Sequence, residues 1–184
     1  TPLKMLWSKS ILVSFLLLVQ SSTSIDVTTP LYSNFTIIGH RGGSSGTASF
    51  IPEHSKAAYA QGASYKASYI EPDVVSSKDG VLLCLHGNEL SGTTDVAELA
   101  EFADRKATKD IGGSSITGWF TEDFTMEEIK TLRLRARNYN GKGPLDGIYQ
   151  LNTFSEMIDF RNELIGLLGR PELGIYPETK LANY

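Results

Sequence analysis

The feature that most constrains the fold of this chain is an apolar run that ends abruptly in a histidine, an arginine and two glycines, FTIIGHRGG at residues 35–43. Apolar and β-branched residues favour a buried strand, which places His40 and Arg41 at its carboxyl tip. In parallel α/β folds, active sites assemble at this tip. Gly42 and Gly43 permit a sharp turn and a close approach to a ligand. An imidazole beside a permanently charged guanidinium suits a phosphate-bearing substrate, although the motif alone also fits a solvated loop.

The composition is that of an ordinary globular protein. The chain has 184 residues, of which 41% are hydrophobic, and a formal net charge of −4. A mildly acidic chain gives no support for nucleic-acid binding, which usually needs a basic face, so we expect a small-molecule partner and no nucleic acid. The one cysteine, Cys84, lies in the apolar run 81–85. It excludes an internal disulfide and favours a buried side chain.

The first 24 residues have the pattern of a secretory signal peptide. Lys4 and Lys9 precede the apolar core 11–19, and small polar residues follow up to Ser24. The core is shorter than the ~20 residues that span a bilayer. We therefore expect cleavage after Ser24, export to the extracellular space or cell wall, and no stable membrane span afterwards. An uncleaved anchor is the alternative.

Two further features concern the ends of the chain. Asn34, Phe35 and Thr36 form a glycosylation sequon, which is meaningful in a secreted chain but also fits an unmodified strand entry. The sequence begins at Thr1 rather than methionine, and it stops soon after the last expected strand. We therefore expect a fragment in which residues 25–184 form a partial domain.

Beyond the signal-like segment, apolar runs alternate with helical patterns. The expected strands are 35–39, 69–75, 81–85 and 173–180, and the expected helices are 56–62, 125–135 and one beginning at 153. Ser76 to Gly80 predicts a turn, because Asp-Gly favours positive φ. Residues 87–124 are too long for an ordinary loop and predict an active-site excursion or a small insertion. Strands separated by helices indicate an α/β fold with parallel pairing, in a barrel or an open sheet.

Glu71 and Asp73 are the first candidate ligand pair. They are two residues apart on an expected strand, so both carboxylates project from one face. Two carboxylates held close together repel unless a cation neutralises them, and Ca²⁺ or Mg²⁺ prefers such oxygen ligands. A strand with a solvated outer face is the alternative, and Pro72 weakens the assignment to a central strand because it removes a backbone donor.

Other polar residues follow the remaining strands. His40 and His86 each terminate an expected strand, so one could act as general base and the other as general acid. Glu178 and Lys180 repeat the two-residue spacing on the last strand. The carboxylate could complete a metal site and the ammonium could pair with phosphate, or both could lie on an exposed strand end.

The sequence resembles the glycerophosphodiester phosphodiesterase family over about residues 37–180. The motifs that carry the resemblance are His40-Arg41-Gly42, Pro52-Glu53, Glu71-Pro72-Asp73, Lys78-Asp79-Gly80, His86 and Pro177-Glu178-Thr179-Lys180. Thr94–Val96 and Gly118–Phe124 are most similar to the periplasmic-type and plant secreted branch of that family.

This resemblance implies a TIM (β/α)8 barrel, here truncated to roughly its first four strands. It also implies hydrolysis of glycerophosphodiesters, such as glycerophosphocholine, to sn-glycerol 3-phosphate and an alcohol. By the same resemblance, His40 and His86 form the acid–base pair.

The resemblance also implies roles for the charged residues. Arg41 would hold the phosphate, and Lys180 would help to neutralise the phosphoryl oxygens. Glu53 would orient His40 or bind near the metal. The ligands of the divalent cation, Ca²⁺ or Mg²⁺, would be Glu71, Asp73 and Glu178.

Two departures keep alternatives open. Gly87 stands where the family pattern usually has an aspartate after the second histidine. An eight-stranded barrel takes about 250 residues, more than this chain supplies. A non-catalytic secreted binding protein is therefore one alternative. A phosphodiesterase that acts on phosphoinositides or sphingolipids is another.

Overall fold

The computed structural model describes residues 35–44, 49–137, 139 and 142–181. The predicted signal peptide, its cleavage site and Asn34 lie outside these residues. From Ile37 onward the chain forms one compact unit. Within the described part of the chain, no helix has both the length and the apolar character that crossing a bilayer requires.

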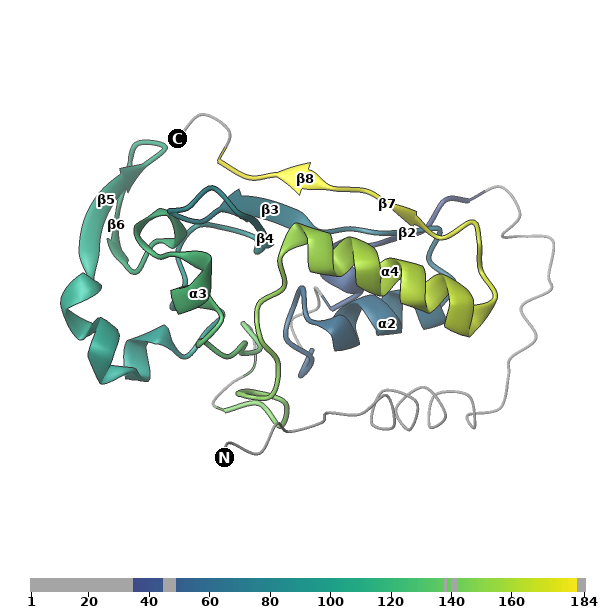
Figure 1. The fold of residues 1–184 in the computed structure, drawn as a ribbon, viewed down its shortest axis with the longest axis horizontal. Coiled ribbons are helices and arrows are strands. Elements are labelled where there is room, and N and C mark those ends of the chain that lie inside the picture. The colour runs from purple at the N-terminus through teal and green to yellow at the C-terminus, as the bar shows by residue number, and fades with distance from the viewer. Residues whose placement is uncertain (1–34, 45–48, 138, 140–141, 182–184) are drawn as a thin grey trace. The chain divides into compact units, whose positions relative to one another are not determined.

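Three segments of the chain run side by side as parallel strands (Figure 1). They are β1 (Ile38–Gly39), then β2 (Tyr69–Ile70) continuing as β3 (Asp73–Ser76), then β7 (Gly174–Ile175) continuing as β8 (Glu178–Thr179). β2 pairs with both β1 and β7, and β3 pairs with β8, in each case in parallel. The second and third segments are both interrupted at a proline, Pro72 and Pro177, which has no N–H to donate to a ladder. The parallel α/β architecture expected from the sequence is confirmed.

The strand predicted at 81–85 pairs in the opposite direction. β4 (Leu82–Cys84) is antiparallel to β3, with Val74 opposite Cys84 and Ser76 opposite Leu82. The turn at Asp79-Gly80 produces this reversal, with Gly80 at φ +78°. The chain therefore travels back toward the beginning of β3, and the N–H of Leu85 donates to the carbonyl of Asp73 at 3.1 Å.

Two longer helices pack on the strands. α2 (Lys56–Ser64) contacts β1 and β2, and α4 (Phe154–Leu168) contacts α2 and β4. Thr153 opens α4 with a capping box, in which its hydroxyl accepts from the N–H of Glu156. The helix predicted at 125–135 is much shorter than expected, because α3 ends after four residues (Met126–Ile129).

The long segment 87–124 has its own local structure. It contains the 3-10 helices η3 (Val96–Glu98), η4 (Ala100–Arg105) and η5 (Thr121–Asp123) and the antiparallel hairpin of β5 (Ala107–Ile111) and β6 (Ser114–Gly118). Its apolar side chains share one buried core with the strands and α3. The residues of the segment in this core are Leu90, Val96, Phe102, Trp119 and Phe124.

Candidate active site

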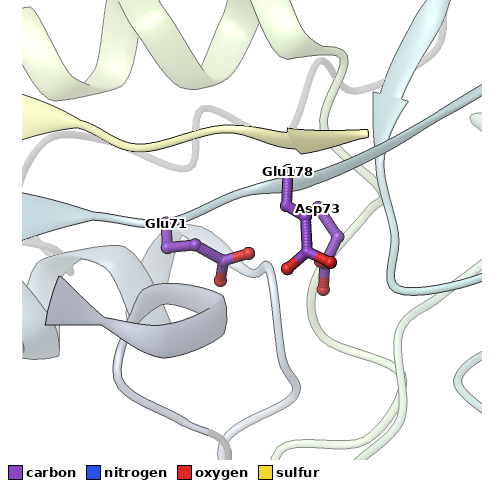
Figure 2. A group of neighbouring side chains, drawn as sticks. All are labelled: Glu71, Asp73 and Glu178. Carbon is purple, nitrogen blue, oxygen red and sulfur yellow. The ribbon is translucent and has the colours of Figure 1, made fainter. Parts of the chain in front are cut away.

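Three carboxylates converge where the interrupted strands resume (Figure 2). Glu71 lies between β2 and β3, Asp73 begins β3, and Glu178 begins β8 directly opposite Asp73 in the ladder. One oxygen from each of the three lies within 4.8 Å of the other two. Glu71 and Asp73 are buried, whereas Glu178 is exposed. The parallel register between β3 and β8 therefore assembles the carboxylate set that the sequence predicted.

Two cationic side chains border these carboxylates. Lys180 places its Nζ 3.0 Å from Asp73 Oδ1 and also forms an ion pair with Glu178. Arg41 places its Nε 3.4 Å from Asp73 Oδ2, and its backbone N–H donates to Glu71 Oε2. Lys180 and Arg41, both predicted to bind phosphate, thus lie at the same place as the predicted metal ligands.

The electrostatics of the carboxylates suit a bound cation. Burial, together with the neighbouring Asp73 carboxylate, raises the pKa of Glu71 above its ordinary value, against a hydrogen bond from the Arg41 backbone. Burial acts in the same direction on Asp73, but hydrogen bonds from His54 and Lys180 outweigh it and hold the pKa of Asp73 well below its usual range. Glu71 Oε1 is buried and has no hydrogen-bond partner among the described residues. A close carboxylate set with an unpartnered oxygen fits a hard divalent cation.

Glu53 holds Arg41 in place. It is 5% exposed, and its carboxylate accepts from Arg41 Nη1 at 3.1 Å and from Arg137 Nη2 at 2.8 Å. Burial alone would raise the pKa of Glu53, but the two guanidinium groups lower it below the ordinary value. The resemblance suggested that Glu53 orients His40 or lies near the metal. In the structure, its hydrogen-bond partners among the described residues are these two arginines.

His40 and His86 reach the same level of the sheet from opposite directions. His40 begins η2 (His40–Gly42) after β1, and the neighbouring Gly39 accepts the N–H of Glu71 at 3.1 Å. His86 follows the reversed strand β4, so it returns to the level at which Asp73 begins β3. Within the described residues, no hydrogen bond joins either histidine to another predicted site residue. Burial, and next the charge of Arg41, lowers the pKa of His86.

The turn that carries His40 and Arg41 requires its glycines. Arg41 itself has a positive φ of 53°, and Gly42 has a φ of 87°. A Cβ on Gly42 would lie 2.7 Å from the backbone of Ala58 in α2, closer than real Cβ atoms approach. The close packing of this turn on α2 explains the glycine that follows the His-Arg pair.

Two residues of this site carried no recognised signal in the sequence. Arg137 lies 84 positions from Glu53, so no local pattern connects them. His54 stands in a turn that indicates only a helix start, yet it is fully buried and lies 3.0 Å from Asp73 Oδ2. Burial lowers the pKa of His54, although the Asp73 carboxylate opposes this effect.

Comparison with known proteins identifies relatives of this chain. A sequence profile of the Glycerophosphoryl diester phosphodiesterase family matches residues 40–183. The glycerophosphodiester phosphodiesterase GDPD6 of Arabidopsis thaliana is 44% identical over 149 residues, which are 78% of this chain and 36% of that protein. A glycerophosphodiester phosphodiesterase of Haemophilus influenzae is 30% identical over 171 residues, which are 87% of this chain and 43% of that protein.

The fold also matches a solved structure. A phosphodiesterase from Oleispira antarctica, determined in complex with the product sn-glycerol-3-phosphate, superposes with a TM-score of 0.53 at 20% identity. The match covers 79% of this chain and 44% of that one. The chain therefore spans less than half the length of each of these relatives.

Proposed function

Because this chain belongs to the glycerophosphoryl diester phosphodiesterase family, we propose that it forms part of a metal-dependent enzyme that hydrolyses glycerophosphodiesters. The proposed substrates, such as glycerophosphocholine, yield sn-glycerol 3-phosphate and an alcohol. The observation that carries this proposal is the convergence of three carboxylates with Arg41 and Lys180 at one level of the sheet.

The cationic side chains would neutralise the negative charge of the substrate. A phosphodiester is an anion that repels an incoming nucleophile, so neutralising its charge lowers the barrier. Arg41 would bind the phosphoryl oxygens with its planar guanidinium, which Glu53 already orients. Lys180, which directly follows β8, would supply a second positive charge.

The carboxylates Glu71, Asp73 and Glu178 would hold the cation, for which Ca²⁺ and Mg²⁺ are the two candidates. A divalent cation bound there would polarise a phosphoryl oxygen. The unpartnered oxygen of buried Glu71 supports this assignment.

His40 and His86 would transfer the protons. One imidazole would remove a proton from the attacking oxygen, for which the neighbouring glycerol hydroxyl is a candidate, and the other would protonate the departing alkoxide. Both residues follow strands that end at the level of the carboxylates, and both strands pair with the β2–β3 segment on the side away from β7 and β8.

An activity assay tests the proposal. The protein that contains this chain is incubated with glycerophosphocholine, and the release of glycerol 3-phosphate is followed with and without EDTA. We expect activity that EDTA removes and that Ca²⁺ or Mg²⁺ restores. His40→Ala should lose at least about 100-fold in kcat/KM, the usual weight of an acid–base group. Glu71→Gln should also lose activity, because it removes the charge of a proposed cation ligand. Glu127→Gln makes the same carboxylate-to-amide change at an exposed position of α3 and should retain activity. Full activity of the His40 and Glu71 variants would overturn the assignment.

One alternative follows from Gly87, which replaces the aspartate that the family pattern usually has at this position. A secreted binding protein with this fold would take up the cation and a glycerophosphodiester without turnover. Calorimetric titration with Ca²⁺ and Mg²⁺ beside the activity assay separates the two functions, since binding without product favours the binding protein. Replacing glycerophosphocholine by a phosphoinositide or a sphingolipid in the same assay tests the other alternative.

We also propose that the protein is exported, on the basis of the signal-like residues 1–24. Expression in a secretory host should deliver it to the medium with Ile25 as its first residue. Terminal sequencing of the secreted protein checks this expectation. Retention of residues 1–24 on a membrane-bound product would favour the uncleaved anchor.

A further inference from the structure

The third histidine of the chain is buried inside the candidate active site. His54 lies in the turn before α2 and has an exposed fraction of 0%. Both of its ring nitrogens are engaged by side chains. Nδ1 lies 3.1 Å from the hydroxyl of Tyr59, and Nε2 lies 3.0 Å from Asp73 Oδ2. Tyr59 is itself completely buried. The three side chains form a hydrogen-bonded chain that ends on a proposed cation ligand.

The order of donors in this chain follows from the acceptor at its end. A carboxylate can only accept, so the hydrogen of the imidazole belongs on Nε2, which donates to Asp73. Nδ1 then accepts from the hydroxyl of Tyr59. The tyrosine hydroxyl therefore selects the tautomer that His54 needs in order to hold Asp73.

The other partners of Asp73 have a second task. Arg41 and Lys180 both contact this carboxylate, and both are also proposed to bind the phosphate of the substrate. Turning toward a phosphate would weaken their hold on Asp73. His54 is fully buried and has no such task, so its contact with Oδ2 can keep the Asp73 carboxylate in place throughout.

The backbone of His54 is also held in a fixed conformation. His54 has a positive φ of 58°, a conformation that is unusual outside glycine. Its N–H donates to the carbonyl of Arg41 at 3.2 Å, and its own carbonyl accepts from Asn152 Nδ2 at 2.8 Å. Arg41 also has a positive φ, of 53°. Such strained residues persist only where the surroundings over-determine them, and they cluster at functional sites.

We propose that His54 is a positioning residue that fixes Asp73 as a cation ligand, and that Tyr59 sets the tautomer in which it does so. The inference rests on the proposed function, because it assumes that Asp73 binds the cation. Hydrogen-bond partners of metal ligands orient those ligands, and losing one typically costs about 10–100-fold in metal affinity.

Cation affinity provides the test, measured by calorimetric titration of Ca²⁺ and Mg²⁺ into the intact chain. His54→Ala should weaken binding by about tenfold or more. His54→Gln carries an amide N–H near the place of Nε2 and should restore most of that affinity. Tyr59→Phe removes only the hydroxyl and should weaken binding by a smaller factor. Tyr65→Phe makes the same change at an exposed site beyond α2 and should have no effect.

The outcomes separate this inference from the proposed function. Wild-type cation affinity in His54→Ala and Tyr59→Phe, or a His54→Gln variant as weak as His54→Ala, would overturn the positioning role. Thermal melting recorded beside each titration identifies a loss of folding, and if His54→Ala does not fold, the other two variants decide. Glu71→Gln binding cations as tightly as the wild type would instead overturn the cation site itself.

Discussion

At the scale of single residues, the most consequential arrangement outside the carboxylate set is the buried Glu53 between two arginines. Arg41 and Arg137 are 15% and 33% exposed in their side chains, whereas Glu53 is 5% exposed. Burial therefore removes the hydration of the Glu53 carboxylate, and its ion pairs with the two arginines offset the free-energy cost of this desolvation. Glu53 fixes the guanidinium of Arg41, so the same contact that stabilises the fold would also orient Arg41 for its proposed role in binding phosphate.

We expect Glu53→Gln to lower the free energy of unfolding by about 3 kcal/mol at pH 7, because removing one partner leaves buried charge uncompensated. Glu127→Gln, on exposed α3 surface, should change it by less than about 0.5 kcal/mol. Urea unfolding followed by circular dichroism measures both. Equal stability of the Glu53 variant and the wild type would show that the contact contributes no net stability.

The stabilising effect of Glu53 should also depend on pH, which a comparison of the wild type with Glu53→Gln can show. Burial raises the pKa of Glu53, but the hydrogen bond and charge of Arg137 and the charge of Arg41 outweigh it, so the folded-state pKa lies below the ordinary 4.5. A depressed pKa contributes stability that is present above pH 4.5 and is lost as the pH falls through the folded-state value. The stability difference between wild type and Glu53→Gln should therefore shrink as the pH is lowered below 4.5. A difference that stays constant in urea titrations across this range would contradict the assignment.

At the scale of elements, the sequence predicts where structure begins better than where it ends. The capping-box pattern at Thr125 correctly predicts the start of α3. The N–H groups of residues 130–132 still donate to carbonyls of residues 126–129, in one last turn. The helix does not continue beyond it because the N–H of Arg133 donates to Asp95 Oδ1 and that of Leu134 to the carbonyl of Tyr149. These partners are distant in the sequence, so no local pattern signals them.

The convergence of the three carboxylates could be predicted from the sequence, because it depends only on the strand pattern. Glu71 and Asp73 lie on one expected strand, and Glu178 lies on another that pairs with it in parallel, so alternation and parallel pairing alone bring them together. His54 and Arg137 depend instead on how a turn and a distant loop fold onto the sheet. The Asp79-Gly80 turn indicates the direction of β4, because such a tight turn joins antiparallel strands.

A glycine in α2 tests how closely this helix supports the His40–Arg41 turn. The predicted helix ended at Gly62, but α2 continues to Ser64, and a Cβ on Gly62 would lie 2.3 Å from the carbonyl oxygen of Gly42. Gly62→Ala should therefore displace the turn, destabilise the protein by about 1–3 kcal/mol and reduce activity. Chemical unfolding and the glycerol 3-phosphate assay measure the two effects.

Gly166 is the matched control for Gly62→Ala. It also lies inside a helix, α4, but a Cβ there would have no atom within 4 Å. Gly166→Ala should stabilise the protein by about 0.5–1 kcal/mol, because alanine loses less backbone entropy in a helix. If the two variants have the same effect, helix propensity rather than contact with the turn governs Gly62.

At the scale of the whole molecule, the parallel strands leave ladder edges open. Among the described residues, β7 pairs only with β2 and β8 only with β3, so the last strand segment has a free side. Tyr176, between these two strands, is 55% exposed, and Ile38 at the opposite edge is 41% exposed. Unpaired backbone groups beside exposed apolar side chains are a template for pairing with another chain.

We therefore expect this chain, when expressed on its own, to self-associate in a concentration-dependent manner through the free side of β7 and β8. Tyr176→Lys should reduce the association, because a charged side chain on an edge opposes strand addition. Tyr65→Lys introduces the same charge at an even more exposed tyrosine, which follows α2 and belongs to no strand, and should leave association unchanged. Sedimentation velocity over a range of concentrations distinguishes these cases. A wild-type chain that stays a monodisperse monomer and melts cooperatively would show that the open edges are protected within the chain itself. If the two lysine variants reduce association equally, net charge rather than the strand edge governs it.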